Sequence, residues 1–294
     1  TKETLNSIKV SVPSSTILTD NADSLIKNKN VDCIVIATPV STHFGLAKKA
    51  LEAGKNVLVE KPMVASLKDA KSLKAVVKKH KSVFMVGHQY VYNDYFSHLK
   101  SSINNGFIGK PRMVIAQYLY PEPIRSDIGC FWDAGTHYLS IIQRLFNPGS
   151  IAEVDGKSIS VISKFDDFTS VIVKFKNGLT ASLTISRLYP EKTRKFMVLG
   201  SKKAAVFDDV EEKYKLKYFP YGKIKNNSIY NHSGGKVKSV IPNIDAKDSL
   251  RNELGHFIYC VRNSKKPLTG IEHSYQITEW LDIISREIRL PGYK

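Results

Sequence analysis

The chain has 294 residues and a formal net charge of +17, from 44 basic and 27 acidic side chains. Its length and its 42% hydrophobic content predict a folded protein of one large or two ordinary domains. The positive charge is spread along the chain in lysine pairs, without a basic arm, a zinc finger or an aromatic RNA-binding signature. We therefore expect no nucleic-acid partner.

Three cysteines, Cys33, Cys130 and Cys260, are odd in number and far apart, which argues against a disulfide framework and fits a reducing cytoplasm. The longest apolar runs have strand length, so we expect no membrane association. The histidines show no metal-ligand spacing with cysteine or carboxylate partners, and we predict no metal site.

Residues 1–91 alternate between strand and helix patterns. The expected helices lie at 4–8, 21–29, 42–54 and 66–80, and the expected strands at 15–18, 32–37, 56–60 and 83–87. The last three strands are apolar runs separated by amphipathic helices, a pattern typical of successive crossovers. We predict a parallel α/β sheet and place the first domain at residues 1–91.

Residues 92–294 begin with helix, strand, loop and helix patterns at 95–105, 112–120, 121–132 and 133–146. Strand patterns then follow one another without helices, at 158–164, 170–175, 180–186, 195–199, 204–207 and 213–218. The Asn177-Gly178 pair predicts a hairpin, so this domain should contain a large, mostly antiparallel sheet. A polar loop at 221–247 precedes two last helices at 248–263 and 273–289, which are free to pack back on the first domain.

The stretch from Asn56 to Pro62 is an apolar run that ends in a carboxylate, a lysine and a proline. In an open parallel sheet ligands bind at the carboxyl ends of the strands. Proline favours extended geometry in the residue before it, so Lys61 should leave the strand on a stiff backbone. A solvated strand end is the alternative interpretation of Glu60 and Lys61.

Asp133 and His137 are four residues apart, so on a helix they face the same way. A histidine can take a proton from an alcohol, and a nearby carboxylate orients it. An aspartate at a helix start is more often a cap than a catalyst. Gly135, between them, favours a site, because glycine inside a helix is costly unless something must approach closely.

Four weaker candidates accompany these residues. Thr38-Pro39 and His43 lie where a strand ends and its helix begins, a place for backbone to meet a cofactor or for a simple turn and cap. His88, after the last strand of the first domain, is as readily a packed residue as a site residue. Arg125 is suited to a carboxylate or phosphate, or is a surface arginine. Trp132 most simply anchors its loop in the core.

Together these motifs resemble one enzyme family. The run Asp32 to Pro39 with Thr42-His43, the run Ala53 to Pro62, and Asp133-Ala-Gly-Thr-His137 are similar to the glucose-fructose oxidoreductase and inositol dehydrogenase (Gfo/Idh/MocA) family. Pro267-Leu268 before the last helix also fits, so the resemblance covers essentially the whole chain. It implies a Rossmann domain followed by a second domain whose open sheet commonly makes subunit contacts, hence a homodimer or homotetramer.

The resemblance also implies an activity and site roles. Family members oxidise or reduce a carbon of a sugar or cyclitol with NAD or NADP. Lys61 would bond the reacting oxygen, His137 would be the general base or acid, and Asp133 would bind and orient substrate. The nicotinamide side would be lined by Thr38, Pro39, His43, Glu60, Lys61 and Pro62. The stretch 123–133, with Arg125 and Trp132, looks like members acting on nucleotide-linked amino sugars, and we place His88 with them on the substrate side.

One departure from the family concerns its first strand, Gly-x-Gly-x-x-Gly turn and helix, because the first glycine of this chain is Gly45. That unit binds the pyrophosphate at a helix N-terminus and spans roughly 30 residues. We expect an N-terminally incomplete enzyme chain. The alternative hypothesis is a non-catalytic relative that has lost dinucleotide binding and binds a sugar or a protein.

Overall fold

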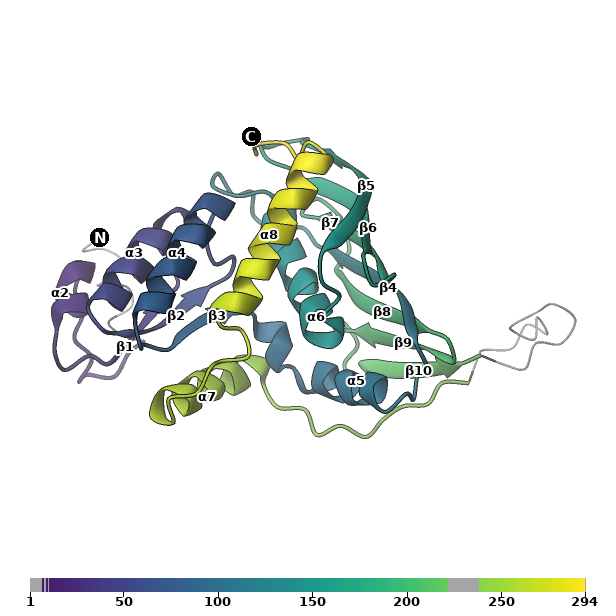
Figure 1. The fold of residues 1–294 in the computed structure, drawn as a ribbon, viewed down its shortest axis with the longest axis horizontal. Coiled ribbons are helices and arrows are strands. Elements are labelled where there is room, and N and C mark those ends of the chain that lie inside the picture. Colours follow the sequence, from purple (N-terminus) through teal and green to yellow (C-terminus); the bar gives the residue numbers. More distant parts are fainter. Residues whose placement is uncertain (1–6, 8, 10, 222–237, 294) are drawn as a thin grey trace, which may run out of the picture.

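The computed structural model describes residues 7, 9, 11–221 and 238–293 (Figure 1). Most of the predicted helix at 4–8 and most of the predicted loop at 221–247 lie outside these residues. Two separate sheets organise the described chain, one of three strands and one of seven. Helix α8 (Ile271–Glu287) runs between them in Figure 1.

The smaller sheet confirms the predicted parallel architecture. Its strands are β1 (Cys33–Ile36), β2 (Asn56–Glu60) and β3 (Phe84–Gly87), in the order β1-β2-β3, and all pairs are parallel. The helices of this part are α2 (Ala22–Lys27), α3 (Val40–Glu52) and α4 (Leu67–Lys79). Ser66 caps α4 by accepting a hydrogen bond from the backbone N–H of Asp69. Because crossovers bring all strands in the same direction, the ends of β1, β2 and β3 share one edge.

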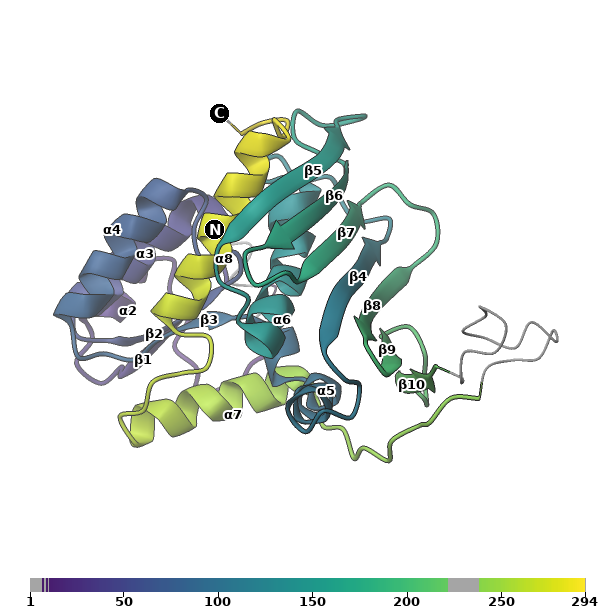
Figure 2. The same ribbon diagram turned by 45° about the vertical axis from the view of Figure 1, so that its right-hand side comes forward.

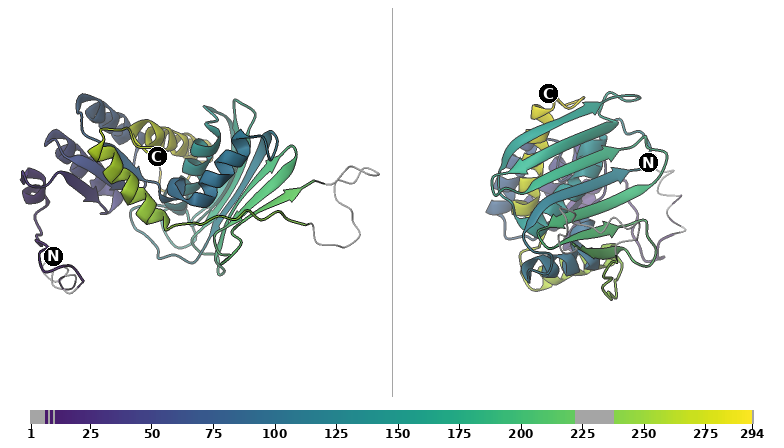
Figure 3. Two further views of the ribbon diagram at one scale, coloured as in Figure 1. Left: turned by 90° about the horizontal axis from the view of Figure 1, so that it is seen from below. Right: turned by 90° about the vertical axis from the view of Figure 1, so that its right-hand side faces the viewer.

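The larger sheet has the order β10-β9-β8-β4-β7-β6-β5, and only the β4–β7 pair is parallel. Its strands are β4 (Pro111–Leu119), β5 (Ile151–Ile159), β6 (Phe168–Phe175), β7 (Thr180–Ser186), β8 (Thr193–Gly200), β9 (Lys203–Asp208) and β10 (Leu216–Pro220). Along these strands buried apolar residues alternate with more exposed ones, and the buried ones form one core with residues of the helices. Figure 3 shows the opposite face without helices over it.

The remaining helices pack against one or the other sheet. They are η1 (Gln89–Tyr92), α5 (Asp94–Asn104), the π-helical turn η2 (Phe131–Gly135), α6 (Thr136–Phe146) and α7 (Ser249–Arg262). In Figure 2, α5, α6 and α8 lie on the inner face of the large sheet, and α7 lies below the small sheet. Phe257 of α7 packs against Leu58 and Met85, so α7 covers one face of that sheet. Helix α8 packs on both cores, because Tyr275 contacts the core of the small sheet and Trp280 that of the large one.

Four expected elements differ from the structure. Residues 15–18 form no strand. The strand expected at 158–164 is β5, Ile151–Ile159, because the backbone turns after it. The carboxylate of Asp167 holds this turn by accepting hydrogen bonds from the backbone N–H groups of residues 161–163. The strand expected at 213–218 is shifted to Leu216–Pro220, and the helix expected from Asp133 begins as the π-helical turn η2.

Candidate active site

Lys61 and Asp133 meet at the carboxyl-end edge of the small sheet. The ammonium Nζ of Lys61 lies 2.7 Å from Oδ1 of Asp133 and donates a second, longer hydrogen bond of 3.2 Å to the Asp133 carbonyl oxygen. Both side chains are partly buried, with exposed fractions of 20% and 13%. The two residues are 72 positions apart in the chain. The contact therefore joins the end of β2 to the first turn before α6.

Asp133 is held in its ionised form. Burial alone would raise the pKa of its carboxyl group, but the charge and hydrogen bond of Lys61 and the charge of Arg125 outweigh it, and the pKa lies below its usual value. Nη1 of Arg125 lies 3.5 Å from Oδ2 of Asp133. A carboxylate between two cations is a fixed acceptor that can orient a hydroxyl group or keep an ammonium in place.

The turn that carries Asp133 is held in place by the buried side chain of Asp166. Oδ2 of Asp166 accepts a 2.7 Å hydrogen bond from the backbone N–H of Phe131. At Gly129 a Cβ atom would collide with the Asp166 carboxylate, so only glycine fits there. At Gly135 a Cβ atom would stand 3.0 Å from the ring of Phe131. The close approach expected at Gly135 is therefore made by a core ring.

His137 stands on the first turn of α6 between two tyrosine rings. The ring of Tyr90 meets it edge-on at 5.2 Å, and the ring of Tyr118 is stacked at 6.0 Å with an interplanar angle of 18°. Burial first, and then the charges of Lys61 and Arg194, hold the pKa of His137 well below its usual value. The imidazole is therefore neutral at neutral pH.

The sequence did not predict a group of polar side chains near His137, which consists of Tyr90, Tyr118, Arg194 and Asp209. Tyr118 receives a 2.6 Å hydrogen bond from Nη2 of Arg194, and the guanidinium also lies 4.5 Å from the ring centre of Tyr118. The hydroxyl of Tyr90 donates to Asp209 at 2.8 Å. These residues come from η1, β4, β8 and the end of β9. Only the β4–β8 register, in which Tyr118 pairs with Arg194, brings them together.

The residues expected on the nicotinamide side surround the ends of β1 and β2 in different ways. Thr38 and Pro39 are exposed. The ring of His43 is buried and lies against the carbonyl oxygens of Thr38, at 2.8 Å, and of Pro62, at 3.0 Å. Its side chain thus ties the two strand ends together. Glu60 accepts a hydrogen bond from the backbone N–H of Lys61, and a cis peptide bond joins Lys61 to the buried Pro62.

The residues expected on the substrate side are not equally placed. Arg125 is 36% exposed and makes a bidentate contact with Asp127, at 3.0 and 2.8 Å, besides its contact with Asp133. The Trp132 side chain is buried, stacks on Tyr293 and donates to Ser285 at 2.8 Å, as a core anchor does. His88 is also buried, close to His137 and His273.

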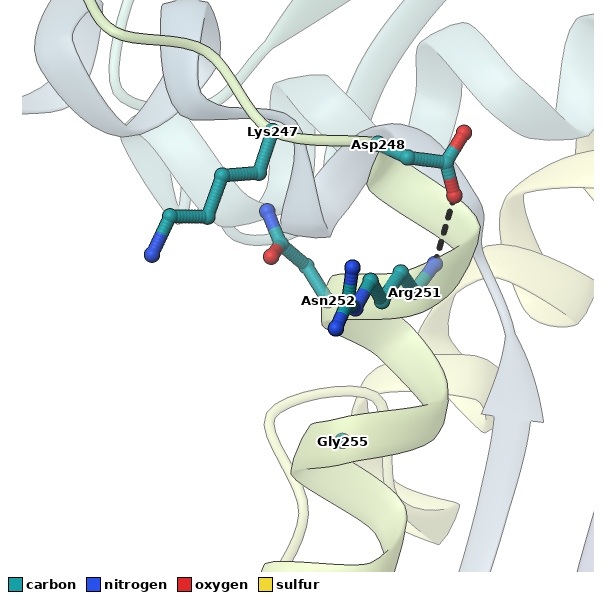
Figure 4. A pocket seen from close by; sticks show the side chains of 5 residues that line it. All are labelled: Lys247, Asp248, Arg251, Asn252 and Gly255. Carbon is teal, nitrogen blue, oxygen red and sulfur yellow. Dashed lines mark hydrogen bonds between the residues drawn. The ribbon is translucent and has the colours of Figure 1, made fainter.

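Other features of the described residues lie apart from this site. A hollow at the start of α7 is lined by Lys247, Asp248, Arg251, Asn252 and Gly255, and Asp248 caps the helix there (Figure 4). Among the described residues, no group of three or more histidine, cysteine, aspartate or glutamate side chains is arranged to hold a metal. None of the described helices has the length and apolarity that crossing a membrane requires.

Comparison with family models matches two parts of the chain. Residues 3–88 match the model described as an oxidoreductase family with an NAD-binding Rossmann fold. Residues 96–206 match the model of the C-terminal domain of the Gfo/Idh/MocA proteins. The two matches together take in both sheets up to strand β9, including Lys61, Asp133 and His137.

Several individual relatives are named as dehydrogenases. The chain is 28% identical to UDP-N-acetylglucosamine 3-dehydrogenase of Acidithiobacillus ferrooxidans, over 60% of this chain and 56% of that protein. It is 26% identical to scyllo-inositol 2-dehydrogenase (NAD⁺) of Bacillus subtilis, over 83% and 71%. A solved structure of the first enzyme matches with a TM-score of 0.80 at 21% identity, covering 96% of this chain and 85% of that one. The matches cover between 48% and 58% of the length of four curated relatives.

Proposed function

The chain belongs to the Gfo/Idh/MocA family of oxidoreductases, and on that premise we propose that it is an NAD(P)-dependent dehydrogenase acting on a CH–OH group of a sugar. The observation that carries the proposal is the meeting of Lys61, Asp133 and His137 at the carboxyl-end edge of a parallel sheet. An ammonium, an ionised carboxylate and a neutral imidazole in one place are the groups that move a proton off an alcohol.

The residues present fit the nicotinamide end of a dinucleotide. Thr38 and Pro39 are exposed at the end of β1, and Lys61 is partly exposed at the end of β2. When bound, the nicotinamide would accept or supply the hydride. In this assignment residues 1–91 carry the cofactor and residues 92–294 bind the substrate. The three free cysteines support a reducing cytoplasm as the place of action.

The chain's own residues manage the proton. His137 takes it from the substrate hydroxyl during oxidation, because its lowered pKa keeps the ring neutral and leaves one ring nitrogen with a free lone pair. Lys61 donates a hydrogen bond to the same oxygen, which stabilises the negative charge that develops there. Asp133 keeps the ammonium in position through the 2.7 Å contact. During reduction of the ketone the same groups act in reverse.

Within this function, we propose a nucleotide-linked amino sugar as substrate. Arg125, Arg194 and Lys61 place three cations around the site, and the net charge of +17 favours anionic ligands. A relative of the chain is named for UDP-N-acetylglucosamine. The test compares turnover of UDP-N-acetylglucosamine, N-acetylglucosamine and myo-inositol with NAD⁺ and NADP⁺. A preference for the two neutral compounds would contradict the nucleotide-sugar assignment.

We also propose a homodimer or homotetramer formed through the open face of the large sheet. Met113 and Ile115 of β4 pair with Leu199 and Met197 of β8, and none of the four is fully buried, although each is apolar. Ile172 of β6 is 48% exposed on the same sheet. Apolar patches of this kind mark protein interfaces. Sedimentation velocity should give a dimer or larger, and an Ile115→Glu variant should shift toward monomer.

A further inference from the structure

Three histidines from three different elements lie in a row behind the site. His137 belongs to α6, His88 to the turn after β3, and His273 to α8. The ring centres of His88 and His273 are 5.5 Å apart. After burial, the charges of His273, His137 and Lys61 are what lower the pKa of His88, so all three are its neighbours. The row therefore starts at the proposed base and leads away from it.

Several ring nitrogens in this row have no partner. Both Nδ1 and Nε2 of His88 are buried without a hydrogen bond, and so is Nδ1 of His137. Leaving buried polar atoms unpaired costs roughly 1–3 kcal/mol each, and such atoms are normally satisfied by internal water. Of the two ring nitrogens of His137, Nδ1 is the one that is buried without a partner. These three nitrogens are suited to water molecules that connect neighbouring imidazoles.

The outer end of the row opens on a cavity. Nε2 of His273 is 2.8 Å from the hydroxyl oxygen of Ser140, and His273 itself lines a surface cavity of about 620 Å³. The same cavity is lined by Asn56 and Val83, at the amino ends of β2 and β3. Lys61 and His88 stand at the carboxyl ends of those strands. His273 therefore lies between His88, at the carboxyl end of β3, and a cavity that extends to the amino ends of β2 and β3.

We propose that His88 and His273 form a water-bridged proton relay between His137 and this cavity. The proposal rests on the dehydrogenase function proposed above. In substrate oxidation the C–H bond breaks and its electron pair leaves as hydride to the nicotinamide, while the O–H proton passes to Nε2 of His137. His137 releases its Nδ1 proton through water to one ring nitrogen of His88. His88 releases a proton from its other ring nitrogen through water to His273, and His273 releases a proton to the water of the cavity. Each ring regains its starting tautomer by proton exchange with the bridging water.

The relay explains why neutral imidazoles suit these positions. A neutral imidazole accepts a proton at one nitrogen and releases one from the other, so no charge has to remain on a buried ring. Burial and neighbouring cations hold the pKa of all three rings low, and that of His273 at about 4. If these histidines only packed the core, neither their unpaired ring nitrogens nor the cavity beside His273 would be required.

The first test requires no turnover. Exchange of the His88 ring N–H with water is measured by ¹⁵N NMR on the full chain, with Nε1–H of Trp280, which is also buried and unpartnered, as an internal reference. The relay predicts His88 exchange at least about tenfold faster than that of Trp280, slowed at least about tenfold by His273→Phe. Exchange as slow as that of Trp280, or exchange unaffected by His273→Phe, would overturn it.

The second test uses turnover in dilute buffer. His88→Phe should lower kcat by about tenfold or more, with KM and NADH affinity within about twofold, and free imidazole should restore kcat in His88→Ala. The matched control His98→Phe, on α5, should leave kcat unchanged. Unchanged kcat in His88→Phe, or a loss that imidazole does not restore, overturns the relay alone. A wild-type chain that binds neither NADH nor NADPH overturns the proposed dehydrogenase instead.

Discussion

Replacing Lys61 with methionine removes the ammonium but keeps most of the apolar stem. In the structure the ammonium contributes a 2.7 Å ion pair to Asp133 and a 3.2 Å hydrogen bond to its carbonyl oxygen. Asp133 would keep Arg125, at 3.5 Å, as its remaining cation. The exposed fractions of 20% and 13% show that water reaches part of the pair. We therefore expect a stability loss of roughly 1–3 kcal/mol, less than for a fully buried pair.

The loss should depend on pH in a defined way. In the wild type the pKa of Asp133 is held below its ordinary value of 3.8, so the pair contributes fully at neutral pH. That contribution disappears as the pH falls through the folded-state pKa. The difference in unfolding free energy between wild type and Lys61→Met should therefore be constant near neutrality and shrink below about pH 4. Urea unfolding followed by circular dichroism at several pH values measures it.

Turnover should fall far more than stability. Loss of a general acid or base, or of its hydrogen bond to the reacting oxygen, typically costs 10²- to 10⁴-fold in rate. We expect kcat of Lys61→Met to fall by about that factor while the chain remains folded at 25 °C. The assay follows NADH or NADPH formation with the best substrate of the wild type. Turnover within about threefold of wild type in the folded variant would refute the assigned role of Lys61.

Three further changes test the supports of the site. Burial, and then the charge of Glu60, raise the pKa of Glu253 to about 8, so the free energy of unfolding should decline from about pH 4.5 to pH 8. Glu253→Gln should remove this decline and stabilise the chain by roughly 2–4 kcal/mol at pH 8. Equal unfolding curves of the two proteins at pH 8 would contradict this. His43→Ala should lower the free energy of unfolding by roughly 1–3 kcal/mol and also lower kcat, because the His43 ring contacts the backbone carbonyl oxygens of Thr38 and Pro62 after β1 and β2. Thermal unfolding and steady-state kinetics measure the two effects. Gly129→Ala should destabilise the chain by roughly 1–3 kcal/mol through collision with Asp166, and an unchanged melting temperature would argue against that contact.

The sequence predicted those parts of the fold that depend on local pattern. The apolar runs that became β2 and β3 are buried, and their composition alone identified them. The run that became β1 was identified in the same way, although Val35 in it is 58% exposed. Strand β5 was misplaced because its side chains alternate only weakly between buried and exposed. Its end depends on Asp167, whose bonds to the backbone at 161–163 have no sequence signature.

Sequence pattern located the strand end that carries Lys61, and the family resemblance added the residues expected around it. The edge rule placed Lys61 at the end of a parallel strand. Asp133 lies in the π-helical turn before α6, and only the family resemblance put it in the same site as Lys61. Tyr118 and Arg194 were missed because only the register of β4 with β8 joins them. His43 was placed correctly at the strand end, but its ring is turned to two carbonyl oxygens, which helix periodicity cannot show.

The central claim is that the carboxyl-end edge of the small sheet serves a nicotinamide cofactor. Its most direct test is a titration of the longest natural form of the protein with NADH and with NADPH, followed by nucleotide fluorescence. The account predicts saturable binding of at least one of them, retained in His137→Ala, whose turnover is lost. Absence of binding for both nucleotides would contradict the account and favour a family member that binds a sugar or a protein without catalysis.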